Sequence, residues 1–169
     1  MGKKEKEIVL GIDPGTRVTG YGAISEDLKP IDFGCIRPPP KLSLEMRYKI
    51  LFESVEALIE RLNPTAVAVE GQFVLKNPQS AIKLGMAKGM VYLAAARKQI
   101  PVYEFAPKKA KLAVVGNGSA SKFQVQKMIQ SLLRLPQIPQ PEDAADALAL
   151  AICCLHTLRT QCLNQSKVS

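Results

Sequence analysis

The stretch Ile8-Val9-Leu10-Gly11-Ile12-Asp13-Pro14-Gly15-Thr16 decides the fold of this 169-residue chain. Its first five residues form a short apolar run, which is typical of a buried strand, and Asp-Pro-Gly closes that run in a turn. Two more strands, predicted over 18–24 and 31–36, follow with short connections. Three strands so closely linked predict an antiparallel meander.

The rest of the chain alternates helices with strands. Apolar spacing predicts a helix over 42–62, with Ser43 as its cap, and a fourth strand follows over 66–69. This order favours a parallel pairing of the fourth strand with the first. The later predicted elements are a helix over 79–98, a strand over 102–105, and helices over 108–115, 122–135 and 142–160. The chain is therefore expected to be α/β, with one domain over 1–160 on a five-stranded mixed sheet flanked by helices, and a polar tail over 161–169.

Composition excludes several classes of protein. With 47% hydrophobic and 22% charged residues, the chain supports one packed core. No apolar run approaches the roughly 20 residues that cross a bilayer, and the charged residues 1–7 are unlike a signal peptide. We therefore expect a cytoplasmic protein that does not enter the membrane. The four cysteines lack zinc-ligand spacing, so we expect reduced, mostly buried thiols.

The net charge of +8 is unevenly distributed along the chain. Between Gly71 and Pro141, eleven basic residues stand against a single acid, Glu104, so this segment carries +10 and the remainder sums to −2. Such a segment predicts a polyanionic partner. A noncatalytic nucleic-acid-binding module would satisfy the charge as well as an enzyme does.

Four acids are placed to meet at one end of the sheet. Asp13 and Glu70 end strands that we expect to be neighbours, while Asp143 and Asp146 share one face of the last helix. Close carboxylates need a counter-charge, and oxygen ligands suit magnesium or manganese. Taken singly, each has a structural alternative: a turn former before Pro-Gly, a solvated strand end, or an acid capping a helix. For Glu142 we favour the capping role.

Several motifs together resemble the RuvC family of Holliday junction resolvases. They are Gly11-Ile12-Asp13-Pro14-Gly15-Thr16-Arg17-Val18-Thr19-Gly20-Tyr21-Gly22, Glu70 followed by Gln72-Phe73, Gly116-Asn117-Gly118-Ser119-Ala120, and Asp143-Ala144-Ala145-Asp146-Ala147-Leu148-Ala149. They stand in the family's order between about residues 8 and 156. The resemblance implies a ribonuclease H-like fold and a homodimeric endonuclease that resolves four-way junction DNA by paired symmetric nicks in recombination and repair. It also implies association with a branch-migration motor.

The resemblance further implies a metal-dependent mechanism. Asp13, Glu70, Asp143 and Asp146 would be both catalytic residues and metal ligands, with two Mg²⁺ ions per site and Mn²⁺ as a substitute. We expect Asp13 to bridge the ions, with Glu70 and Asp143 each completing one shell. Asp146 would bind metal directly or orient a water. The products would carry a 5′-phosphate and a 3′-hydroxyl.

DNA contacts are expected from the basic segment and from one aromatic residue. Lys111 and Lys122 match family positions implicated in the active site or in DNA contact, and Phe73 is placed to stack on an unpaired base. For the other lysines a solvated face is an equal alternative, and for Phe73 a core anchor. The full expected set is Phe73, Lys76, Lys83, Lys108, Lys111 and Lys122.

Two further features bear on assembly and on rival functions. Ala81, Gly85 and Gly89 make a small-residue helix face that suits either contact across a twofold axis or packing on the chain's own sheet. His156 should face away from the acids.

Asp-x-Gly-Thr also occurs in actin-like and sugar-kinase ATPases, but the two lobes of those proteins need a longer chain than this one. A smaller RNA-processing nuclease shares the turn, although its chains are usually shorter.

Overall fold

The computed structural model describes residues 7–71 and 77–165, and it shows the expected mixed sheet. The strands are β1 (Ile8–Asp13), β2 (Thr19–Ser25), β3 (Pro30–Ile36), β4 (Ala66–Glu70) and β5 (Val102–Phe105). They lie in the order β3-β2-β1-β4-β5. β1 is antiparallel to β2 and parallel to β4, so the predicted meander and crossover are both confirmed.

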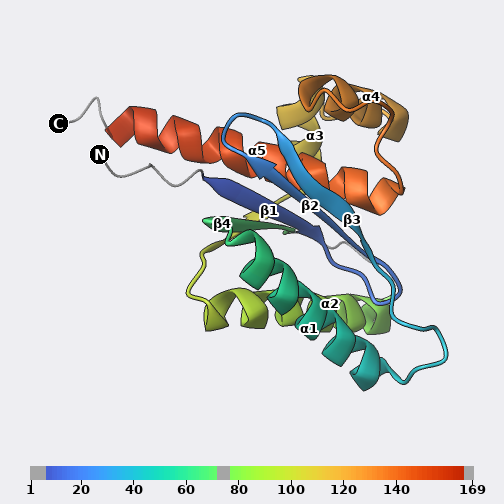
Figure 1. The fold of residues 1–169 in the computed structure, drawn as a ribbon. Coiled ribbons are helices and arrows are strands. Elements are labelled where there is room, and N and C mark those ends of the chain that lie inside the picture. Colours follow the sequence, from blue (N-terminus) through green and yellow to red (C-terminus); the bar gives the residue numbers. More distant parts are fainter. Residues whose placement is uncertain (1–6, 72–76, 166–169) are drawn as a thin grey trace.

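Helices cover both faces of the sheet (Figure 1). They are α1 (Leu44–Leu62), α2 (Pro78–Arg97), α3 (Pro107–Val115), α4 (Lys122–Leu132) and α5 (Glu142–Gln165). One face packs against α1 and α2, and the other packs against α5, which α3 and α4 then cover. None of the helices in the described ranges is long and apolar enough to cross a membrane.

The ends of two helices differ from the sequence-based ones by three residues or more. α4 ends at Leu132 rather than 135 because Arg134 adopts a left-handed conformation with φ of 52°. α5 continues to Gln165, through part of the expected tail, since residues 142–165 contain neither Gly nor Pro to end it. Ser43 does occupy the N-cap of α1, but its side chain makes no capping hydrogen bond.

α5 lies unusually close to the sheet. A Cβ atom added at Gly11 of β1 would stand 1.9 Å from the carbonyl oxygen of Ala147, and one added at Gly20 of β2 would stand 1.9 Å from that of Asp143. Only glycine permits this approach. Almost every residue between 144 and 155 is buried. The sheet covers one side of α5, and α3 and α4 together cover the other side.

This packing brings distant segments to one end of the sheet. β1 and β4 run parallel, so their carboxyl ends share an edge, and the first turn of α5 reaches the same edge. In Figure 1 this is the right-hand end of the molecule, where α2 and α4 also begin. Open α/β sheets carry their sites at such edges.

Candidate active site

A pocket of about 270 Å³ opens at this edge, between the strand ends and α3, α4 and α5. Asp13, Glu70 and Asp146 line it, so three of the four predicted acids meet there. Lys111 and Lys122 line the same pocket, opposite in charge to the acids. Its remaining walls are largely apolar: Pro107, Ala110, Val125, Ala149 and Leu150.

Asp13 is the electrostatic centre of the pocket. Burial, together with the nearby carboxylates of Glu70, Asp146 and Asp143, raises the pKa of Asp13 to about 7, and Lys122 opposes the rise. The three other acids thus all lie close enough to repel the ionised form of Asp13. A carboxylate held in this way favours either a proton or a cation as its neighbour.

Lys122 supplies part of the counter-charge. Its Nζ lies 3.3 Å from Glu142 Oε2 and 3.8 Å from Asp146 Oδ2. Asp146 raises the pKa of Lys122, while burial raises the pKa of Asp146 against the pull of Lys122. Burial and Asp146 likewise raise the pKa of Glu70. Both ion pairs are largely exposed, so they contribute little to stability and leave Lys122 able to exchange partners.

Asp143 lies beside the pocket rather than in its wall. It lines an adjoining hollow with Thr16, Arg17 and Lys83. Over residues 7–71 and 77–165, no three His, Cys, Asp or Glu side chains are gathered tightly enough to hold one metal ion. The four acids therefore surround a common space without meeting at a point.

The structure places the expected DNA contacts in different surroundings. Lys83 lines the hollow beside Asp143, and exposed Lys108 lies against the glycine loop, because a Cβ at Gly118 would stand 2.7 Å from Lys108 Cγ. Phe73 and Lys76 fall outside the described residues. His156 lines a separate hollow between α3 and α5.

The four cysteines lie in different surroundings. Cys153 and Cys154 are buried in α5, Cys35 is partly buried in β3, and Cys162 is exposed on the last turns of α5. The expectation of buried thiols therefore fails for Cys162, because α5 extends past the core at its end.

The sequence analysis missed one network near Glu70. Lys88 Nζ lies 2.8 Å from Glu104 Oε2 and donates a 3.4 Å hydrogen bond to the carbonyl of Gly71, the residue after Glu70. Tyr92 also donates to Glu104. This network ties α2 to the end of β4. Its signal in the sequence was Glu104 itself, the single acid of the basic segment.

Comparison with known proteins shows the family. The family model described as crossover junction endodeoxyribonuclease RuvC matches residues 9–154. The chain belongs to the RuvC family. RuvC of Protochlamydia amoebophila is 58% identical over 149 residues, which cover 86% of this chain and 89% of that protein. RuvC of Chlamydia pneumoniae is 48% identical, with coverage of 91% and 95%.

Solved RuvC structures share the fold. Thermus thermophilus RuvC in complex with a Holliday junction substrate superposes with a TM-score of 0.86 at 31% identity, covering 92% of this chain and 96% of that one. The predicted ribonuclease H-like fold is thereby confirmed. Membership of the RuvC family makes the chain a crossover junction endodeoxyribonuclease that resolves Holliday junctions by metal-dependent cleavage. The ATPase, RNA-processing and noncatalytic alternatives are set aside.

Proposed function

We propose that the pocket at the ends of β1 and β4 is where this chain cuts junction DNA, with Asp13, Glu70, Asp143 and Asp146 as its catalytic acids. The observation that carries the proposal is the pocket itself, which Asp13, Glu70 and Asp146 line together with Lys111 and Lys122. Unpartnered acids in such a position would only destabilise the fold. Their grouping beside basic side chains suits phosphodiester chemistry.

The donor set fits a hard divalent cation. All four ligands are carboxylate oxygens, which Mg²⁺ and Mn²⁺ prefer, and a cation would offset the repulsion that burial imposes on Asp13. We propose that Asp13 is shared between two Mg²⁺ sites completed by Glu70 and Asp143, with Asp146 as a further ligand or water-orienting group. When bound, two such ions supply an activated water and stabilise the leaving 3′ oxygen.

The protein's own residues hold the substrate for this reaction. Lys111 and Lys122 line the pocket and would bind the phosphates next to the scissile bond. Lys122 would leave Asp146 and Glu142 as DNA arrives, because those exposed pairs are weak. Lys83 and Lys108 would contact phosphates farther along.

A second copy of the chain completes the proposed function, since two symmetric nicks need two sites. α2 offers the surface for it. Ile82, Met86 and Leu93 are 64%, 49% and 50% exposed along one side of the helix. An added Cβ at Gly85 or Gly89 meets nothing within 4 Å, so these glycines are not packed on the chain's own sheet. This apolar strip suits a close helix–helix contact across a twofold axis.

Three expectations from the resemblance stay predictions. They are association with a branch-migration motor, a cytoplasmic location and the stacking of Phe73 on an unpaired base. A pull-down with a motor complex, fractionation of cells, and 2-aminopurine fluorescence at the crossover would test them in turn.

The decisive experiment uses a synthetic four-way junction and a linear duplex of equal length. We expect cutting of the junction alone, dependent on Mg²⁺ and abolished by a chelator. Asp13→Asn should abolish cleavage while the junction still binds, because the lysines that contact phosphate are untouched. Ser119→Ala, on the exposed glycine loop, is the control. Equal cutting of both substrates, or loss of binding in Asp13→Asn, would contradict the assignment of roles.

A further inference from the structure

A second basic surface lies beside Asp143, and three of its four basic residues come from outside the basic segment 71–141. The hollow next to Asp143 has a volume of about 420 Å³ and is lined by Thr16, Arg17 and Lys83. A neighbouring hollow of about 270 Å³ is lined by Arg17, Arg37 and Arg47 and by the three prolines 38–40. Arg17 and Val18 line both hollows, so the two adjoin at this turn, and we refer to them together as the depression.

Three arginines from separate parts of the chain converge there. Arg17 belongs to the turn between β1 and β2, Arg37 follows β3, and Arg47 lies in the first turns of α1. Arg17 is therefore carried by the turn that follows Asp13, and Arg37 by the start of the loop that contains the three prolines. Neither Arg17 nor Arg37 makes an ion pair with a carboxylate in the part of the chain that the structure describes.

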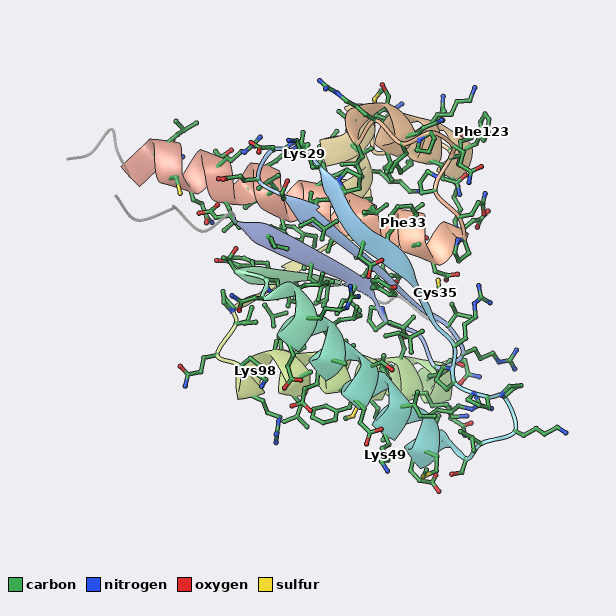
Figure 2. The ribbon with its side chains drawn as sticks, viewed as in Figure 1. Lys29, Phe33, Cys35, Lys49, Lys98 and Phe123 are labelled. Atoms are coloured by element: carbon green, nitrogen blue, oxygen red, sulfur yellow. The ribbon has the colours of Figure 1, made fainter. Side chains whose placement is uncertain are left out.

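The arginines have different local roles. Arg47 donates to the carbonyls of Leu42 and Pro40, so its guanidinium holds the proline loop in place. Arg17 and Arg37 are exposed and are free of such backbone bonds among the described residues. Arg37 also reaches Cys35, whose thiol has a pKa raised first by burial and then by Asp143, and lowered by Arg37. Arg37 and Asp143 thus both lie near the Cys35 thiol, and Figure 2 shows Cys35 at this end of β3.

We propose that Arg17 and Arg37 bind backbone phosphates of a junction arm, on the side of the scissile position opposite Lys111 and Lys122. A planar guanidinium binds a phosphate through two parallel hydrogen bonds, and the prolines keep the loop that presents Arg37 stiff. The depression begins at Asp143, so a strand leaving the proposed active site would enter it directly. This inference rests on the proposed function, because it takes the pocket as the place where DNA is cut.

The test compares two pairs of substitutions that remove the same charge. Arg17→Gln/Arg37→Gln removes the proposed contacts. Lys29→Gln/Lys49→Gln removes two exposed charges, which Figure 2 places at the β2–β3 turn and on α1 and which do not line the depression. Junction binding is measured in chelator over a series of salt concentrations. Each phosphate contact contributes a slope of ~0.9 to the dependence of log K on log salt concentration.

We expect the arginine pair to lower the slope by about 1.8 and the lysine pair to leave it unchanged. Arg17→Lys/Arg37→Lys should restore the slope because it keeps the charge. An unchanged slope in the arginine pair, or an equal loss in the lysine pair, would overturn the proposal. If the double variant does not fold, Arg17→Gln alone, in an exposed turn, is expected to lower the slope by about 0.9. Failure of the proposed function would show separately, as wild-type protein that does not cut.

Discussion

At the scale of single residues, Asp13 shows how burial creates chemistry. It ends a strand whose four preceding residues, 9–12, are buried, and Asp-Pro-Gly turns the chain immediately afterwards. Burial, and after it the neighbouring carboxylates, raises the pKa of Asp13 to about 7, because the strand cannot withdraw its last side chain from this place. A solvated aspartate with the usual pKa near 4 is stable as an anion in water and does not need a cation beside it.

This shift predicts how stability depends on pH in metal-free protein. The folded state retains a proton on Asp13 up to about pH 7, whereas the unfolded state releases it near pH 4. Stability contributed by this group is therefore lost as pH rises from about 4 to about 7, at up to about 1.4 kcal/mol per pH unit. In urea unfolding with chelator present, the free energy of unfolding of Asp13→Asn should rise relative to that of the wild type as the pH increases from about 4 to about 7. A constant difference between the two proteins would contradict the shift.

The acids were predictable as residues but not as an arrangement. Their types and their places at strand ends and on one helix face follow from spacing alone. That Asp143 lines the neighbouring hollow, while Asp146 lines the pocket, depends on how α5 is rotated against the sheet. Periodicity in the sequence does not determine that rotation, because residues 144–155 other than Asp146 are apolar on every side of the helix and are buried.

At the scale of elements, the contact between α5 and the sheet is the most demanding in the fold. Gly11→Ala would place a Cβ 1.9 Å from the Ala147 carbonyl, which belongs to backbone and cannot rotate away. We expect a loss of about 3 kcal/mol or more in the free energy of unfolding. Gly22→Ala, on the paired strand, meets Leu148 side-chain atoms at 2.7 Å and should cost less. Denaturant titration compares the two, and equal costs would contradict this account.

Most elements were predictable because their ends carry local signals. Pro78 and Pro107 begin helices, and Gly116 ends one with φ of 76°. The errors came where such signals were lacking. Leu133 to Leu135 continue the apolar spacing of α4, and the helix is stopped by a local left-handed turn at Arg134, in which the Leu135 N–H donates to the carbonyl of Gln130.

At the scale of the whole molecule, folding gathers charges that lie far apart in the sequence. Summing charge along the chain found the basic segment but hid the arginines, because acids elsewhere in the N-terminal part cancel them. Arg17, Arg37 and Arg47 become neighbours only after the sheet forms. A linear count cannot detect such a surface.

The apolar strip on α2 predicts the state of assembly. Met86→Asp should convert a dimer into monomers in sedimentation experiments, because it buries an unpaired charge in the contact. Leu112→Asp, which alters a 54% exposed leucine on α3, should leave the dimer intact. On a cruciform plasmid the Met86 variant should give nicked circles instead of linear product. A monomeric wild type, or a dimeric Met86 variant, would contradict the proposed interface.

The glycines of β1 and β2 have one more consequence. Gly20 touches the backbone of Asp143 itself, so the missing side chain on the sheet sets the height at which an acid stands above it. The activity of this enzyme therefore depends on glycine positions that carry no functional group. A Gly→Ala substitution beneath α5 would displace Asp143 and lower the rate of cleavage, although every catalytic acid and basic residue would still be present. A search for the catalytic motifs would therefore not detect the defect.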